Sequence, residues 1–207
     1  MNWIRKFKNG LRGLKQRWGT PAIKRALWNS EFGQGRWDYI EHTAGDIIYS
    51  YLAKYTRNGS ILDLGCGSGN TGCELAAEDY REYTGVDISD VAIEKARQRS
   101  QAAGRSAKNE YFQCDIMTFV PRKLYDVILF RESIAYIPRA KVPALLARYA
   151  KYLNREGVFI VRWSNARQGE EIMEHAEGYR LVERHTTPDG SGPFLAIMEW
   201  SAVPRQA

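Results

Sequence analysis

The residues with the clearest chemical potential are a glycine-rich turn and the two carboxylates on either side of it. The turn GCGSGN at 65–70 directly follows the run ILDL, in which Asp63 is the charged residue. The second carboxylate, Asp87, ends the run YTGVD and lies 22 residues after Gly65. Glycines after a strand allow a ligand to approach the backbone closely, and an acid at the end of the next strand can accept hydrogen bonds from both ribose hydroxyls. The pattern therefore predicts a site for an adenosine-containing ligand.

The spacing of the glycines separates two classes of such ligands. Dinucleotide sites use the pattern GxGxxG, whose third glycine would fall on Asn70 in this chain. Here the third glycine comes one position earlier, at Gly69, and Asp63 stands two residues before the first glycine. Both differences argue against a dinucleotide and leave other adenosine-containing cofactors.

The elements that must position this turn can be predicted from the pattern of apolar residues. From residue 60 onward, strand-like and helix-like runs alternate, which is typical of a parallel sheet with crossover helices. The predicted strands are 60–64, 82–86, 109–113, 125–130 and 157–162. The predicted helices are 70–78, 90–103, 139–153 and 168–176, preceded by one over 36–55 and one that begins at Thr20–Pro21. The tail from 179 to 200 reads as an antiparallel hairpin around a Pro/Asp/Gly turn.

Four segments in order carry a resemblance to a known family. They are DLGCGSG at 63–69, GVDIS at 85–89, CDI at 114–116 and YDVILFRES at 125–133. Over roughly residues 60–200 the chain resembles the class I S-adenosylmethionine-dependent methyltransferases. The resemblance implies an α/β three-layer sandwich with a seven-stranded, mostly parallel sheet whose last strand is antiparallel. It also implies S-adenosyl-L-methionine as the cofactor.

The resemblance assigns a role to each matching position. The methionine end of the cofactor would be held by the first turn: Asp63, Gly65, Cys66, Gly67 and Gly69. The ribose would bind Asp87, and the adenine would contact Ile88, Asp115 and Ile116. The sulfonium and its methyl group would lie beside Phe130 and Arg131.

The segment FRESIAYIP at 130–138 is where such enzymes face the methyl acceptor. Glu132 and Tyr136 are therefore the candidate catalytic residues, as a proton acceptor or as groups that position the acceptor. The alternatives are an ion pair of Glu132 with Arg131 or with a basic residue near the N-terminus, and core packing of Tyr136. Trp37 and Tyr39 could cover the acceptor or could anchor the 36–55 helix to the sheet.

The same segment narrows the acceptor class. It lacks the Asn/Asp-Pro-Pro-aromatic motif of enzymes that methylate base amines, the two glutamates of protein-arginine enzymes, and the extra carboxylates of metal-dependent catechol enzymes. With Trp28 and Trp37 separated by eight intervening residues, it resembles the type 11/12 group, which includes nodulation-factor N-methyltransferases. We expect a small-molecule, glycan or lipid-linked acceptor, with O- and N-methylation both open. An RNA methyltransferase and a non-catalytic cofactor-binding protein are the rival functions.

The positive charge of the chain is concentrated at its start. The 207 residues carry a net charge of +6, yet residues 1–30 contain eight basic residues and no acidic one. The remainder has a net charge of −2. We therefore expect a basic arm, 1–30, and a domain, 31–207, which the resemblance implies is a methyltransferase domain.

The arm has helical periodicity between residues 3 and 18. Its apolar residues fall on one face and its basic residues on the other: Trp3, Ile4, Phe7, Leu11, Leu14 and Trp18 against Arg5, Lys6, Lys8, Arg12, Lys15 and Arg17. Such a helix suits an anionic membrane surface. The alternatives are a helix whose apolar face packs on its own domain and, less favoured, a nucleic-acid contact.

Composition excludes several other classes. Three cysteines without CxxC spacing predict no disulfide framework, which favours a cytoplasmic protein, peripheral on the inner membrane surface if the arm binds lipid. His42, His175 and His185 are far apart, so we expect no metal site. We also expect no membrane span and no secretory signal.

Overall fold

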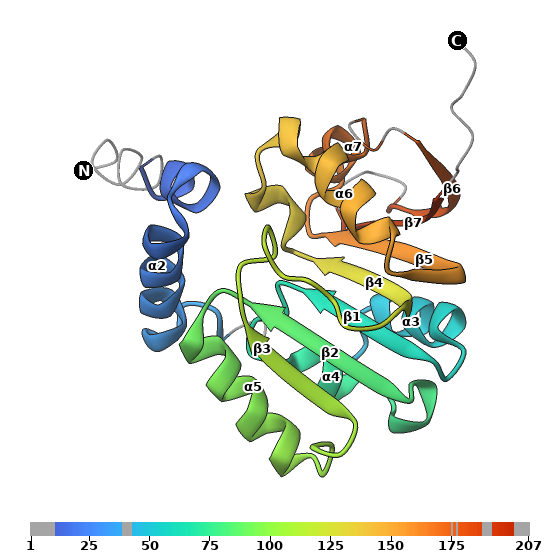
Figure 1. Cartoon of the computed structure of the whole chain (residues 1–207), viewed down its shortest axis with the longest axis horizontal. Coiled ribbons are helices and arrows are strands. Elements are labelled where there is room, and N and C mark those ends of the chain that lie inside the picture. Colours follow the sequence, from blue (N-terminus) through green and yellow to red (C-terminus); the bar gives the residue numbers. More distant parts are fainter. Residues whose placement is uncertain (1–10, 39–42, 175, 177, 188–191, 201–207) are drawn as a thin grey trace.

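Seven strands form one sheet in the computed structural model of the chain, which describes residues 11–38, 43–174, 176, 178–187 and 192–200. The strand order is β3-β2-β1-β4-β5-β7-β6, and β7 runs antiparallel to both of its neighbours. The strands are β1 (Ser60–Leu64), β2 (Glu82–Asp87), β3 (Asn109–Gln113), β4 (Tyr125–Arg131), β5 (Leu153–Trp163), β6 (Tyr179–His185) and β7 (Phe194–Trp200). The predicted three-layer fold with an antiparallel last strand is confirmed (Figure 1).

Helices cover both faces of this sheet, and one further helix lies beyond its edge. The helices on the faces are α3 (Ile48–Thr56), α4 (Asn70–Glu74), α5 (Asp90–Ala102), α6 (Val142–Ala150) and α7 (Ala166–Met173), and the helix beyond the edge is α2 (Pro21–Gly33). Residues 11–18 form a further helix before α2, and 3-10 turns occupy Ala77–Asp79, Ile134–Tyr136 and Arg139–Lys141. The predicted domain boundary at residue 30 lies inside α2.

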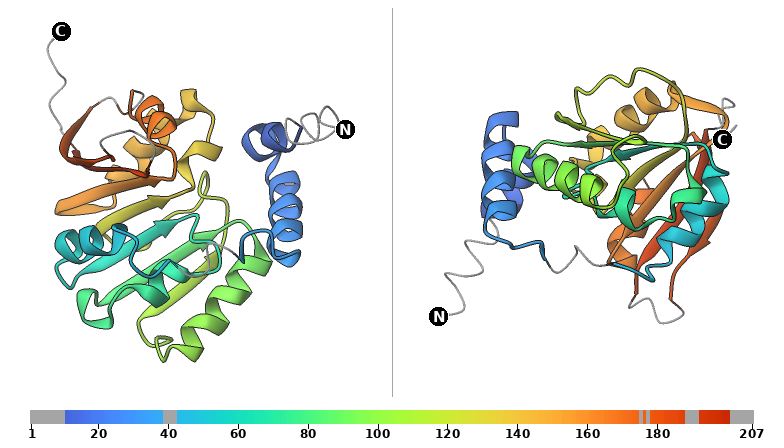
Figure 2. Two further views of the ribbon diagram at one scale, coloured as in Figure 1. Left: turned by 180° about the vertical axis from the view of Figure 1, so that it is seen from behind. Right: turned by 90° about the horizontal axis from the view of Figure 1, so that it is seen from below.

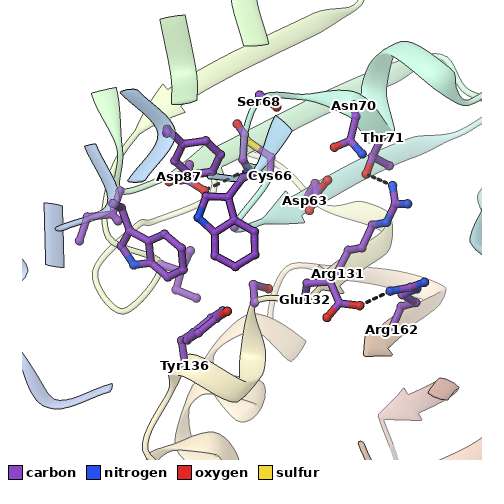
Figure 3. A pocket seen from close by; sticks show the side chains of 18 of the residues that line it. Asp63, Cys66, Ser68, Asn70, Thr71, Asp87, Arg131, Glu132, Tyr136 and Arg162 are labelled. Atoms are coloured by element: carbon purple, nitrogen blue, oxygen red, sulfur yellow. Dashed lines mark hydrogen bonds and ion pairs between the residues drawn. The ribbon is translucent and has the colours of Figure 1, made fainter. Parts of the chain in front are cut away.

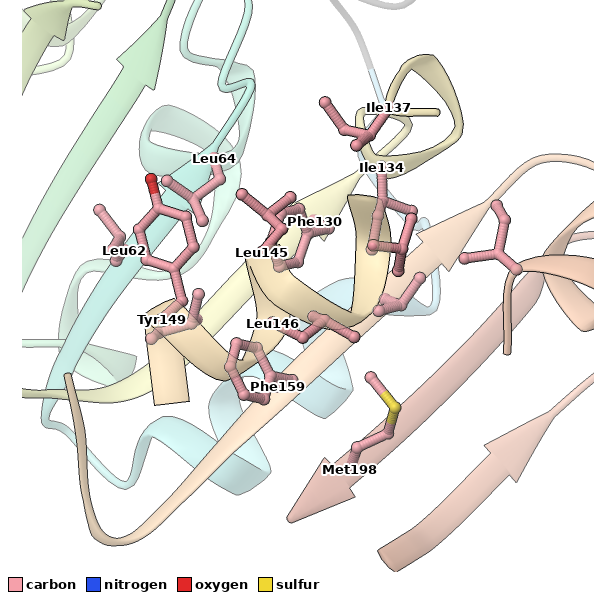
Figure 4. Close-up of a cluster of buried hydrophobic side chains, with 14 of the residues drawn as sticks. Leu62, Leu64, Phe130, Ile134, Ile137, Leu145, Leu146, Tyr149, Phe159 and Met198 are labelled. Carbon is pink, nitrogen blue, oxygen red and sulfur yellow. The ribbon is translucent and has the colours of Figure 1, made fainter. Parts of the chain in front are cut away.

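The core is divided in two by the sheet because side chains alternate along each strand. On β4, Ile128 and Phe130 belong to the cluster under α6 and α7, which Figure 4 shows. Val127 and Leu129 belong to the opposite cluster under α3, α4 and α5. Burial on both faces explains why the central strands read as continuous apolar runs in the sequence.

The largest error in the predicted elements concerns the helix over 36–55. The observed helix, α3, begins only at Ile48. It is preceded by a turn in which Gly45 has φ +89°. In this turn Asp46 accepts a hydrogen bond from the Ile48 backbone N–H and forms ion pairs with Arg131 and Arg162. These contacts hold the turn out of the helix. Smaller differences are an earlier end of α4, at Glu74, and an earlier start of β5, at Leu153.

The helix α2 begins where the sequence predicted it. Thr20 caps it by accepting a hydrogen bond from the Ile23 N–H at 3.4 Å, and Pro21 occupies the first turn. Arg25 and Asn29 bind the carboxylate of Asp90 at the start of α5, with distances of 2.7 to 2.8 Å. These bonds fix α2 beyond the carboxyl ends of the parallel strands, as Figures 1 and 2 show.

Candidate active site

A cavity of about 350 Å³ opens at the carboxyl ends of β1, β2, β4 and β5, beneath the N-terminal helices. Parallel α/β sheets bind ligands at this edge, where the strand order reverses around the first strand. Figure 3 shows its polar lining. The lining residues on the sheet side are Asp63, Gly65, Cys66, Gly67, Ser68, Asn70, Thr71, Asp87, Ile88, Asp115, Ile116, Arg131, Glu132, Ser133, Tyr136, Ile137, Arg162 and Ser164.

The glycine turn takes its shape mainly from backbone conformation. Gly65, Gly67 and Gly69 have φ of +87°, +53° and +77°, a region that other residues rarely adopt. A Cβ on Gly65 would lie 2.4 Å from Ser133, and one on Gly69 would lie 2.7 Å from Ala96. Gly65 and Gly67 line the cavity and Gly69 does not, so its predicted contact with a ligand stays a prediction. Gly69 caps α4 and lets it pack on α5.

Asp87 ties the glycine turn to the next loop. Its Oδ2 accepts a hydrogen bond from the Gly67 N–H at 3.0 Å, and its Oδ1 accepts one from the Ser89 N–H at 2.8 Å. Burial raises the pKa of this carboxyl to about 6, against the opposing effect of these backbone donors. Each oxygen keeps acceptor capacity toward the cavity, which suits a ligand with paired hydroxyls.

Asp63 carries an unused acceptor deeper in the cavity. Tyr83 donates to its Oδ2 at 2.6 Å, while Oδ1 is buried and has no hydrogen-bond partner. Burial raises the pKa of this carboxyl to about 6, and the Tyr83 hydroxyl and the Arg131 guanidinium act in the opposite direction. A buried unsatisfied carboxylate oxygen is costly, so it indicates a donor or cation that the ligand supplies.

The predicted adenine contacts lie together on one wall. Ile88, Asp115 and Ile116 all line the cavity, and the Asp115 Oδ1 accepts a hydrogen bond from the Met117 N–H at 2.8 Å. Phe130 does not join them, although the sequence predicted that it would border the reacting group. Its side chain is fully buried among core residues on the other face of β4, where its ring stacks on Phe159.

Glu132 lies in the cavity with a strained backbone. It has φ +55°, and its carboxylate forms an ion pair with Arg162 at the end of β5. Arg162 also binds Asp46 at 2.9 Å, and Asp46 binds Arg131 at 3.0 Å. The alternative predicted from the sequence was an ion pair of Glu132 with Arg131 or with a basic residue near the N-terminus. Backbone strain of this kind costs about 1 to 3 kcal/mol and is concentrated at functional sites.

Aromatic rings from α2 and from the turn after β4 close the cavity. Trp28 packs edge-on against Tyr136 with centroids 4.9 Å apart, and Trp37 lies 5.7 Å from Trp28. Phe32 covers the glycine turn, with its Cζ 3.4 Å from a Cβ position on Gly67. Tyr136 thus lines the cavity and also packs against Trp163, so its position and its packing role coexist.

Several lining residues were missed by sequence reasoning. Asp46 and Arg162 belong here, together with Gln16, Trp28 and Phe32 from the N-terminal helices. A charged residue at the carboxyl end of a central strand was the available signal for Arg162. The others depend on how the arm folds back over the sheet.

Other predicted groups lie elsewhere. His185 is on β6, 6.3 Å from the ring of Tyr51, while Tyr39, His42 and His175 lie outside the described residues. Across the described part of the chain, no cluster of His, Cys, Asp or Glu could hold a metal ion. No described helix is long and apolar enough to cross a bilayer.

Known methyltransferases resemble this chain over part of its sequence. The family model described as "Methyltransferase domain" matches residues 61–157. A ubiquinone biosynthesis O-methyltransferase of Rickettsia akari is 31% identical over 122 residues, which is 58% of this chain and 47% of that protein. The chain spans about half the length of the curated relatives it matches first.

Two solved structures share the fold. Magnesium protoporphyrin IX methyltransferase from Synechocystis, solved with bound SAM, has a TM-score of 0.68 at 18% identity, covering 87% of this chain and 97% of that one. The N-methyltransferase NodS from Bradyrhizobium japonicum, solved with S-adenosyl-L-homocysteine, has a TM-score of 0.67 at 19% identity, covering 85% and 97%. The TM-scores establish a shared fold, and sequence identities this low leave the methyl acceptor open.

Proposed function

We propose that the chain is a class I S-adenosylmethionine-dependent methyltransferase, whose cavity binds S-adenosylmethionine and transfers the methyl group to a hydroxyl or amine of a small-molecule, glycan or lipid-linked acceptor. The observation that carries this proposal is the pair of buried carboxylates at the edge of the sheet. Asp87 offers acceptors for two ribose hydroxyls, and the unpartnered Asp63 Oδ1 offers one for the ammonium group of the methionine. The cofactor supplies an already activated methyl group.

The remaining lining residues fit the same ligand. The wall of Ile88, Asp115 and Ile116 can hold the adenine, with Asp115 accepting a hydrogen bond from its amino group. The Gly67 backbone and the Phe32 ring, which lie against each other, then line the same part of the cavity. Arg131 lies at the end of β4 but is already engaged with Tyr49, Thr71 and Asp46, so we assign it to the framework of the site.

The chemistry required of the protein is alignment and management of one proton. Displacement at the methyl carbon needs the acceptor in line with the departing sulfur, which is a matter of positioning and exclusion of water. Glu132 can accept a hydrogen bond from the acceptor hydroxyl or amine, while Arg162 holds its carboxylate in place. Tyr136 and Trp28 of α2 can position the acceptor from the opposite side.

The lining of the cavity supports the proposed acceptor class. An aromatic roof beside a Glu/Arg pair suits a ring or an apolar chain that bears one polar nucleophile. The rival functions, an RNA methyltransferase and a non-catalytic cofactor-binding protein, make different predictions. We also propose that the protein acts at the cytoplasmic membrane surface, because its basic arm is suited to binding anionic lipid.

Two measurements test the proposal in order. Isothermal titration with S-adenosylmethionine and with S-adenosylhomocysteine should give a single site per chain that is lost on Asp87→Ala. Labelled methyl groups should then pass from the cofactor into the lipid or glycan fraction of a cell extract. Transfer into RNA would favour the first rival, and binding without transfer into any fraction would favour the second.

A further inference from the structure

The helix over residues 11–18 presents its apolar side to solvent. Leu11, Leu14 and Trp18 are 43%, 57% and 63% exposed, and Ile23 in the first turn of α2 is 45% exposed. At 100° per residue the first three fall within one 60° arc. An outward row of large apolar side chains on one short helix is unusual on a soluble protein surface.

The opposite side of the same helix faces the active site and is polar. Gln16 is buried and lines the cavity, and Arg12 forms an ion pair with the buried Glu31 of α2. Arg17 donates a hydrogen bond to the Ala135 carbonyl at 3.0 Å, in the turn that also carries Tyr136. The alternative in which the apolar face packs on the domain is therefore reversed for the described residues. Polar contacts fix this helix on the domain, and its apolar face is exposed to solvent.

Basic side chains lie near this apolar row. Lys15 and Arg17 are exposed on the same helix, and Lys141 is exposed before α6. Lys24 on α2 is half-buried and lines the cavity; burial lowers its pKa, Asp115 opposes that effect and Lys141 adds to it. None of the four forms an ion pair with another described residue. The preceding residues 1–10, which lie outside the described part, add three basic residues and no acidic one.

We propose that Leu11, Leu14, Trp18 and Ile23 form a docking surface for a membrane rich in anionic phospholipid. Apolar groups with a tryptophan at their edge insert at the level of the headgroups, and each nearby basic residue strengthens binding about fivefold. The positive charge near this surface favours lipid phosphate over a second copy of this chain, because two copies would bring the same basic residues close to one another. The polar side of this helix covers the cavity, so docking on a membrane would bring the cavity close to the bilayer. If the proposed function holds, this position favours a lipid-linked methyl acceptor.

The test is sedimentation of the full chain with vesicles. Vesicles of phosphatidylcholine with phosphatidylglycerol should carry the chain down, and vesicles of phosphatidylcholine alone should do so much less. The double substitution Leu14→Gln/Trp18→Gln should lower the partition coefficient by at least about tenfold. The matched control Val120→Gln/Leu124→Gln removes two equally exposed apolar residues outside the arm and should leave it unchanged. Lys15→Gln should reduce binding about fivefold.

Three results would overturn the inference. The first is equal sedimentation of the wild type and the arm variant. The second is a concentration-dependent dimer in solution that the arm substitutions abolish, since the surface would then bind a second copy. The third is RNA binding lost in the arm variant without any vesicle binding by the wild type. Cofactor affinity, measured without vesicles, should be equal in the wild type and both double variants, so its absence in all three would instead refute the proposed function.

Discussion

Replacing Asp87 with alanine should weaken cofactor binding by at least about a hundredfold. A carboxylate offers about four acceptor positions, and the structure uses two of them for the N–H groups of Gly67 and Ser89 at 3.0 and 2.8 Å. Two remain for the ribose hydroxyls. A hydrogen bond to a charged group contributes about 1.5 to 3 kcal/mol, so the loss of two costs about 3 kcal/mol at the lower limit. That corresponds to a rise in Kd of roughly 150-fold.

The assay is isothermal titration of S-adenosylmethionine into each variant, with a thermal melt as a check on folding. Because Asp87 also ties the glycine turn, Asp87→Ala could lose its structure for reasons unrelated to the ligand. Asp87→Asn keeps the size of the side chain and one carbonyl oxygen, and should raise Kd about tenfold or more. Glu78→Gln, an exposed substitution in the turn before β2, is the matched control and should bind as the wild type does.

A Kd within about threefold of wild type in a folded Asp87→Ala variant would refute the reasoning, since that threefold change is less than 1 kcal/mol. The ribose would then lie elsewhere, and the assignment of the whole cavity would fail with it. If Asp87→Ala does not melt cooperatively, the Kd of Asp87→Asn is compared with that of the wild type by the same criterion.

Three further predictions follow from the same site. The pKa values of Asp63 and Asp87 are about 6 in the free protein, and the cofactor's ammonium and hydroxyl groups favour the ionised forms. Binding therefore releases protons, and Kd measured by titration should rise as the pH falls below 6, by about fourfold per carboxyl at pH 5.5; a flat profile contradicts this. Glu132→Gln should lower kcat by about a hundredfold or more with cofactor Kd unchanged, and equal loss of both would make it a structural residue. Gly69→Ala should reduce the free energy of unfolding in urea by about 2 to 4 kcal/mol, because it adds a close contact to a left-handed φ, whereas Gly104→Ala, left-handed but in open space, should cost only about 1 kcal/mol; equal costs would remove the packing argument.

The sheet and the first two binding turns could be predicted from the sequence because their signals are local. A buried parallel strand is a contiguous apolar run, and the turn after it must contain residues that tolerate positive φ. Asp63 and Asp87 follow from their distance to that turn. The same local logic could have corrected the prediction for Phe130, since alternation along β4 places it and Arg131 on opposite faces.

The rest of the site depends on contacts between distant segments. Glu132 meets Arg162 only because β4 and β5 are neighbours in a register that aligns Arg131 with Arg162. The turn at Asp46 replaces a predicted helix because two arginines from those strands hold it. For the arm, periodicity defines two faces but contains nothing that says which of them turns inward.

The position of β7 has a consequence for how this protein is made. The strand that completes the pairing of β5 is the last of the described strands, and β6, which precedes it, pairs only with β7 among them. During synthesis, the residues that line the cavity therefore leave the ribosome before β7, the strand that pairs with the open side of β5. Until Phe194–Trp200 emerges, β5 keeps an open, strongly apolar flank, and a chaperone would have reason to bind there.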